Sequence, residues 1–170
     1  MENSPALLTD RLELRRWREA DSVAAHMLLS DPVVNRFLPW WPTKSEAEAL
    51  TFLRERYLNT YDDHIGYRYA VCPRGTDTPI GYVNVDRGSA HDLGYGIDRT
   101  HQNQGLITEA AQAVIARVRE DGAIPFLTAT HDRENPRAAR SCASWAWSTG
   151  TATKNSCSPN RNWWSSASTR

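Results

Sequence analysis

Hydrophobic residues alternate with polar ones in some segments and recur at helical spacing in others. The segment "LLTDRLELRRW" (residues 7–17) alternates around Leu12 and Leu14 after a turn at Thr9-Asp10, which predicts a strand. "READSVAAHMLLSD" (18–31) and "TKSEAEALTFLRERYL" (43–58) have the spacing of amphipathic helices. The predicted helix caps are Asp21 or Ser22 for the first helix and Thr43 or Ser45 for the second.

The periodicity changes in the second half of the chain. Residues 67–73, 80–87 and 91–98 read as three consecutive strands, the first two joined by the turn "RGTDTP". Apolar residues at every fourth position then predict a helix beginning near Leu106, and "AIPFLTATHD" (123–132) reads as one more strand. This order predicts an α/β fold of the α+β type, with a mixed, largely antiparallel central sheet flanked by helices.

Composition limits the function classes. The 170 residues suffice for one domain, and 20 basic residues balance 20 acidic ones, which does not favour nucleic acid or an anionic membrane as partner. The N-terminal segment has no long apolar run, so we expect neither a signal peptide nor a membrane span. Cys72, Cys142 and Cys157 lack metal-ligand spacing, and we expect reduced thiols in a cytoplasmic protein without a metal. A loop ending in Gly-Lys-Ser/Thr is absent, which disfavours a nucleotide-phosphate enzyme.

The stretch "HQNQGLITEA" (101–110) enters a helix with few carboxylates. The N–H groups of a first helical turn are unpaired and carry a partial positive charge, so they can bind an anion. Local chemistry leaves two interpretations open: an anion site, or an ordinary helix start with a permissive glycine.

Five segments together resemble the GNAT superfamily of acyl-CoA N-acyltransferases, in particular its ribosomal-protein acetyltransferase-like (RimJ/RimL-like) branch. They are "LLTDRLELRRWREAD", "IGYVNV", "LGYGID", "HQNQGLITEA" and "THDRENPRA". The resemblance covers about residues 7–139, which we expect to form a GNAT-like domain. Gln102 and Gly105 fill the first places of the family's pyrophosphate loop, whereas Ile107 stands where the family prefers a small residue.

The resemblance implies acetyl-CoA as co-substrate and a primary amine, on a protein N-terminus or a small molecule, as acceptor. The residues that it assigns to the cofactor are Ile97, Gln102, Asn103, Gln104, Gly105, Leu106, Ile107, Thr108 and Asn135. Acceptor binding is expected at the first two helices and the "LPWWP" loop, with Trp40 and Trp41 as candidates. The protein is expected to be a monomer or a homodimer.

The resemblance does not identify a catalytic residue. The amine must lose a proton and the leaving thiolate must gain one. In this branch a serine three residues after the asparagine can serve the thiolate, but that position is Ala138 here. We assign no role to His91, His101 or His131. Glu109 is expected to bind a nearby basic or backbone group rather than to catalyse. The alternative function is a non-catalytic acyl-CoA-binding remnant.

The tail, residues 140–170, departs from the family. After Leu127 the chain has no Leu, Ile, Val, Met, Phe or Tyr, yet the tail contains four of its seven tryptophans. The family has a helix, a Leu-Gly-aromatic or Leu-Gly-Met turn and two hydrophobic strands here, and this tail has none of their patterns. A flexible Ser/Thr-rich extension is one interpretation.

Our hypothesis is a shifted reading frame. Tryptophan has a single codon, TGG, and every alanine codon begins with GC. A frame that starts at the third base of each codon therefore reads GGC, glycine, at the junction of Trp145 and Ala146. That glycine falls 146 − 135 = 11 residues after Asn135, where the family has its turn. Across Asn162, Trp163 and Trp164 the same frame forces Leu and then Val, as a final strand would require. The sheet of the chain as written is then expected to be incomplete at its C-terminal part.

Overall fold

The computed structural model describes residues 4–36, 41–62, 66–86 and 90–129, together with the backbone of 150–158 and 161–168. Its strands are β1 (Leu7–Leu8), β2 (Leu12–Arg15), β3 (Gly66–Pro73), β4 (Gly81–Asp86), β5 (Leu93–Ile97), β6 (Gly150–Ser158) and β7 (Arg161–Ser168). The helices are α1 (Ser22–Ser30), α2 (Glu46–Arg56) and α3 (Leu106–Asp121), with short 3-10 turns η1 (Glu19–Asp21), η2 (Leu58–Thr60) and η3 (Arg99–His101).

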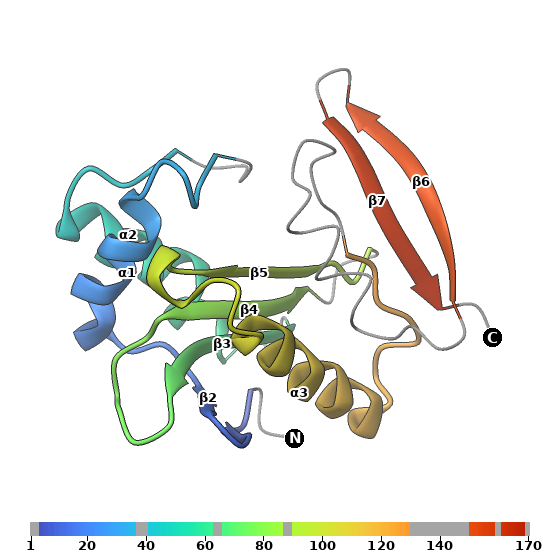
Figure 1. Cartoon of the computed structure of the whole chain (residues 1–170), viewed down its shortest axis with the longest axis horizontal. Helices are drawn as coiled ribbons and strands as arrows, with labels where there is room; N and C mark the ends of the chain where they lie inside the picture. The colour runs from blue at the N-terminus through green and yellow to red at the C-terminus, as the bar shows by residue number, and fades with distance from the viewer. Residues whose placement is uncertain are drawn as a thin grey trace.

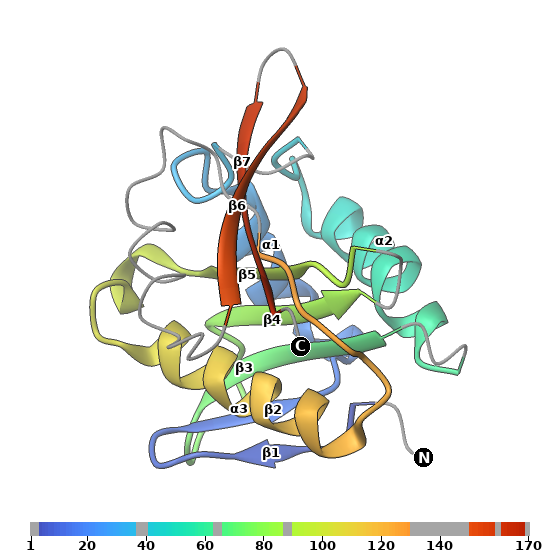
Figure 2. The same cartoon turned by 90° about the vertical axis from the view of Figure 1, so that its right-hand side faces the viewer.

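Strands β1 to β5 form one antiparallel sheet in chain order (Figure 1). The predicted sheet flanked by helices is therefore confirmed. The helices lie on opposite faces of this sheet, with α3 on one face and α1 and α2 on the other, as Figures 1 and 2 show together. Each face has its own apolar cluster because side chains of a strand alternate between the two faces.

The cluster under α3 is the larger one. It joins the buried face of that helix to side chains from β2 to β5, among them Leu12, Leu14, Tyr69, Val83, Val85, Leu93 and Ile97. The cluster under α1 and α2 contains more aromatic groups. Its members include Trp17, Leu28, Leu53, Tyr57, Tyr61, Ala70 and Tyr82.

The caps of the first two helices differ in chemistry. Ser45 caps α2, and its hydroxyl accepts the N–H of Glu48 at 3.2 Å, as one of the two candidates predicted. Asp21 holds the N-cap position of α1, but its side chain makes no capping bond. The Asp21 carboxylate accepts both terminal nitrogens of Arg15 instead, each at 2.9 Å.

The Arg15–Asp21 pair is buried, with side-chain exposures of 5% and 6%. Arg15 also donates through Nε to a carboxylate oxygen of Asp77 at 2.8 Å and through Nη2 to the Asp77 carbonyl at 2.7 Å. Its hydrogen bond with Asp21 is the main reason that the pKa of Arg15 lies above its usual range. This pair ties β2, the start of α1 and the β3–β4 turn together.

The C-terminal part differs from the prediction in two ways. Within residues 123–129 the predicted strand makes only an isolated parallel bridge, between Thr128 and Asp92; residues 130–132 lie outside the described residues. The tail does form strands: β6 and β7 pair antiparallel in a separate two-stranded sheet (Figure 1). The sequence pattern did not predict these two strands, since the tail has none of the hydrophobic patterns of the family. Threonine and tryptophan favour extended backbone even where aliphatic residues are missing.

Candidate functional site: a helix N-terminus beside a strand edge

The loop between β5 and α3 has an unusual backbone. Asn103 and Gly105 both have positive φ, 61° and 74°, on either side of Gln104. Left-handed backbone suits glycine and is tolerated by asparagine. A Cβ on Gly105 would lie at ordinary contact distance, 3.5 Å, from Nη2 of Arg11, so the backbone conformation and not a lack of space favours glycine. The glycine of the predicted motif is thus required by the shape of this loop.

The N-terminus of α3 offers backbone donors. The first intrahelical hydrogen bond from this end runs from the N–H of Glu109 to the carbonyl of Gly105, at 3.0 Å. The N–H groups of Leu106, Ile107 and Thr108 precede that bond and have no place in the helical ladder. They and the helix dipole together produce a positive potential in front of Gly105.

The amide side chains of the loop stabilise its own backbone. Gln104 donates through Nε2 to the carbonyl of Thr100 at 2.9 Å, and Gln102 donates a longer bond, 3.4 Å, to the carbonyl of Ile97. Uncharged side chains therefore hold the loop to the end of β5 and to η3. A carboxylate in either place would oppose an anionic ligand.

Glu109 is the acidic residue of the first turn of α3, and its carboxylate faces the N-terminal hairpin. It accepts Oγ1 of Thr9 at 2.6 Å, the N–H of Arg11 at 3.0 Å and Nε of Arg11 at 2.7 Å. Arg11 additionally donates through Nη1 to the carbonyl of Gln104 at 2.9 Å. The prediction of a basic or backbone partner for Glu109 is confirmed. The partners themselves, Thr9 and Arg11, lie about 100 residues away along the chain, and sequence reasoning did not find them.

We expect Glu109→Gln to weaken this contact and to change its pH dependence. Burial acts to raise the pKa of Glu109, but hydrogen bonds from Thr9 and Arg11 and the charge of Arg11 outweigh it, and the pKa is lowered from 4.5. A lowered folded-state pKa contributes stability above the unfolded pKa that is lost as pH falls through the folded pKa. The variant should lose roughly 1 kcal/mol at neutral pH and progressively less as the pH falls through the folded-state pKa of Glu109.

The measurement is the melting temperature of both proteins at neutral pH and near pH 3, with the exposed Glu55→Gln as control. A deficit of equal size at both pH values would contradict the assignment.

The outer edge of β5 adjoins the loop. Asp98 donates its N–H to the carbonyl of Ile80 at 2.8 Å, so Asp98 faces β4. Residues of an antiparallel strand alternate between facing the partner and facing away, which directs the backbone groups of Leu93, Tyr95 and Ile97 to the outer edge. The N–H of Leu93 donates outward to the carbonyl of Thr128, at 2.7 Å. In the described part of the chain, strand pairing on this edge is limited to that end, remote from the loop.

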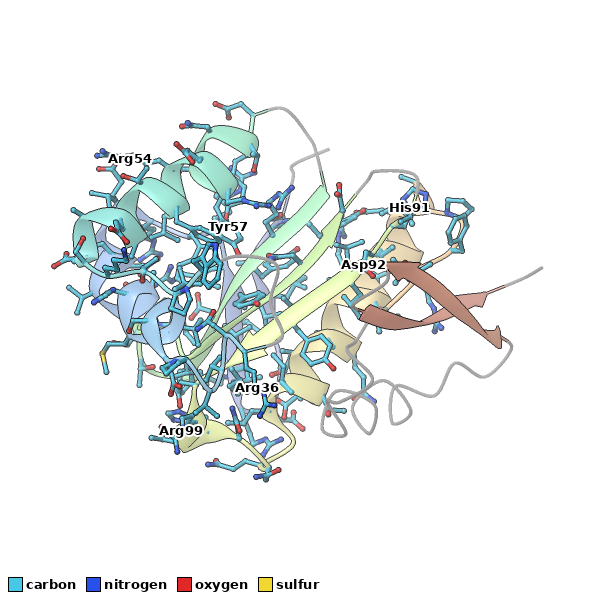
Figure 3. All side chains as sticks on the ribbon, turned by 90° about the horizontal axis from the view of Figure 1, so that it is seen from above. Arg36, Arg54, Tyr57, His91, Asp92 and Arg99 are labelled. Carbon is cyan, nitrogen blue, oxygen red and sulfur yellow. The ribbon has the colours of Figure 1, made fainter. Side chains whose placement is uncertain are left out.

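The other candidate residues lie apart from the loop or have structural contacts. Ile107 packs its side chain against the cluster under α3. His101 is held by Asp98, Nδ1 to Oδ2 at 2.8 Å. His91 lies at the opposite end of β5, where its ring packs on Phe126 with 4.9 Å between centroids (Figure 3). Trp41 is 92% exposed at the approach to α2.

Several predicted positions fall outside the described residues, namely Trp40, His131, Asn135 and Ala138. Among the residues that are described, none of the His, Cys, Asp and Glu side chains gather in groups of three able to hold a metal. None of the described helices combines the length and the hydrophobicity needed to span a bilayer.

A family model described as an acetyltransferase (GNAT) domain matches residues 11–144. Since this match covers most of the chain, the protein belongs to the GNAT acetyltransferase family. The recognition made from the sequence is confirmed, and the family is one of acyl-CoA-dependent acetyltransferases.

Solved structures with similar folds have low sequence identity. An acetyltransferase from Agrobacterium tumefaciens matches at TM-score 0.79 and 19% identity, over 98% of this chain and 95% of its own. RimL, a ribosomal L7/L12 alpha-N-protein acetyltransferase in complex with coenzyme A, matches at 0.77 and 16%, over 96% and 97%. A ribosomal-protein-S5-alanine acetyltransferase from Vibrio fischeri matches at 0.71 and 17%, over 96% of each chain. None of the curated proteins compared with the chain matches it.

Proposed function

We propose that this chain binds acetyl-CoA at the N-terminus of α3 and transfers the acetyl group to a primary amine on a protein N-terminus or a small molecule. The observation that carries the proposal is the loop of residues 102–105. Its two left-handed residues lead directly into α3. The N–H groups of Leu106 to Thr108 come before the first hydrogen bond of that helix, so they can donate to a ligand. A pyrophosphate is an anion of the kind that such donors bind.

The outer edge of β5 would hold the remainder of the cofactor. Ile97 lies at the end of that strand next to the loop, and its N–H faces the outer edge. The pantetheine arm is a chain of amides, and an exposed strand edge can bind amides through the same pattern as another strand. The thioester then lies beside β5, where an amine attacks its carbonyl carbon directly, and the thiolate leaves as the amide forms. The proposed acceptors are those of the RimJ/RimL-like branch, and the proposed location is the cytoplasm. Trp40 and Trp41 are proposed to contact the acceptor, and Asn135 is proposed to contact the cofactor.

The direct test combines binding and turnover. The chain is incubated with acetyl-CoA and a panel of primary amines while thiol release is followed, and CoA binding is measured by calorimetry. Amine-dependent thiol release supports the proposal, and a chain that binds no CoA contradicts it.

We expect Asn103→Asp to weaken CoA binding. Aspartate adopts left-handed backbone almost as readily as asparagine, so the loop keeps its shape. The added carboxylate opposes the pyrophosphate at a helix N-terminus, where a charge contributes about 0.3–2 kcal/mol, equivalent to a roughly 2- to 30-fold higher Kd. Titration calorimetry measures the change, and the exposed Asn59→Asp in η2 is the matched control. Equal affinities for both variants would refute the placement of the anion.

A second candidate function is an acyl-CoA-binding remnant without turnover. It is favoured by the tail, which has no Leu, Ile, Val or Met and lies largely beyond the family match that ends at residue 144. CoA binding without thiol release for every amine of the panel would select this second function.

A further inference from the structure

One row of residues crosses the sheet on the face that α1 and α2 cover. Arg68 of β3 pairs with Asn84 of β4, and Asn84 pairs with Gly94 of β5. Because directly paired residues point to the same face, this polar row lies among the aromatic side chains of the smaller cluster. It ends at β5, the strand beside which the thioester is proposed to lie.

Asn84 is held in place by a tyrosine. Its Nδ2 donates to the phenol oxygen of Tyr57 at 3.1 Å. Tyr57 is itself fixed, since its ring contacts Trp17 and Phe52 at centroid distances of 5.6 and 6.2 Å. Figure 3 shows Tyr57 between the helices and the strands. Burial raises the pKa of Tyr57, so the phenol stays neutral around pH 7.

The other end of the Asn84 amide is unsatisfied. Its Oδ1 is buried and has no hydrogen-bond partner among the described residues. A buried carbonyl oxygen without a donor costs about 1–3 kcal/mol, so a ligand group that donates a hydrogen bond to this atom would recover that cost.

Gly94 of β5, the residue that pairs with Asn84, has open space above it. A Cβ placed on Gly94 would meet no heavy atom of the described residues within 4 Å. The next glycine of β5 differs, because a Cβ on Gly96 would lie 2.6 Å from the ring of Tyr82. The strand is therefore covered by an aromatic ring at Gly96 and open at Gly94. Neighbouring strands lie about 4.8 Å apart, so a group over Gly94 is one strand spacing from Asn84 and also next to the outer edge.

We propose that Asn84 binds the acceptor amine, with Oδ1 accepting an N–H of the nucleophile in the space over Gly94 and Tyr57 fixing the orientation of the amide. The guanidinium of Arg68 lies close enough to affect the phenol of Tyr57 electrostatically. A positive charge on this row disfavours an ammonium ion there, so the acceptor binds as a neutral amine, the form that can attack the thioester. This inference rests on the CoA-binding function proposed above.

The test uses two CoA conjugates that need no turnover. In one, the CoA sulfur carries –CH2–CO–NH–CH3, whose N–H stands for the acceptor nitrogen. In the other it carries –CH2–CO–O–CH3, which has the same shape and no donor. Calorimetry compares the two affinities, and that of free CoA, in the unchanged chain and in three variants. These variants are Asn84→Ala, Tyr57→Phe and the exposed control Asn59→Ala.

We expect the unchanged chain and Asn59→Ala to prefer the amide by about five- to tenfold, the range of one net hydrogen bond. Asn84→Ala should lose this preference and keep its affinity for free CoA, and Tyr57→Phe should reduce the preference in part. If Asn84→Ala keeps the preference for the amide conjugate, or if the unchanged chain has no such preference, the inference about Asn84 is overturned while the proposed function stands. Failure of both conjugates and of CoA to bind would overturn the proposed function together with it.

Discussion

A chain re-read in the alternative frame is expected to melt cooperatively and to release thiol from acetyl-CoA when an amine is present. The chain as written is expected to show low or absent turnover. The change is one inserted nucleotide between codons 136 and 142, so that every later codon begins at the present third base. We expect this difference because the family needs hydrophobic strands where the tail supplies none.

The energetic size of the effect follows from burial. Six to eight missing core side chains at about 1.5–3 kcal/mol each correspond to roughly 10–20 kcal/mol. A whole domain is stable by only about 5–15 kcal/mol. A loss of that size is enough to leave the C-terminal part of the fold without a core.

The codons of β6, like those of β7, encode apolar residues when they are read in the alternative frame. At the junction of Ser156 and Cys157 the alternative frame must read Leu, Met or Val, because every such codon ends in TG. The junctions on either side, with Asn155 and Ser158, admit Phe or Leu. Both tail strands of the structure thus coincide with places where the alternative frame is apolar.

The test of the shifted reading frame is to measure thermal unfolding and thiol release for the chain as written and for the re-read chain under the same conditions. The control is an insertion that produces the third frame, which gives glycine at every tryptophan codon and should not rescue the protein. A chain as written that melts cooperatively and turns over as fast as the re-read chain would refute the hypothesis.

Asp21→Ala is expected to lower the free energy of unfolding by about 3–5 kcal/mol. The substitution leaves the guanidinium of Arg15 in a buried position with its main partner removed. Asp77 still contacts Arg15, which favours the lower end of this range, but Asp77 is 70% exposed and cannot replace a buried carboxylate. The midpoint of urea unfolding, with an unchanged slope, measures the loss.

Two further variants make this result specific. Asp62→Ala, at an exposed aspartate, should change stability by no more than about 0.5 kcal/mol. The double variant Arg15→Met with Asp21→Leu should recover most of the loss, because replacing both ions by apolar groups removes the uncompensated charge. If Asp21→Ala lowers the free energy of unfolding by less than about 1 kcal/mol, the Arg15–Asp21 pair does not hold β2, α1 and the β3–β4 turn together.

Local signals in the sequence sufficed for most of the fold. Alternation around Leu12 and Leu14 and the four-residue spacing after Leu106 identified the strand and the helix, because each depends on neighbours within the same segment. The tail was misjudged for the opposite reason. Its apolar pattern is missing, but backbone pairing in a hairpin needs only residues that tolerate extended conformation.

The loop of the candidate site was predictable, whereas its surroundings were not. Gly105 belongs to a contiguous motif, and its left-handed backbone follows from that motif. The contacts of Glu109 with Arg11, or of Asn84 with Tyr57, join residues that are far apart along the chain. Such contacts depend on the register between strands and the packing of helices, which one sequence does not specify locally.

The contact between Arg11 and the loop has a consequence for the order of folding. Arg11 and Glu109, 98 residues apart in sequence, must meet before Arg11 can hold the loop through the carbonyl of Gln104. Contacts at large sequence separation form slowly because closing a long loop costs entropy. We therefore expect the loop of residues 102–105, the proposed CoA site, to form late, after β2 has joined the sheet. If CoA binds at the proposed site, its binding during refolding should lag behind helix formation. Newly made chains would then have their helices and sheet before they could bind CoA.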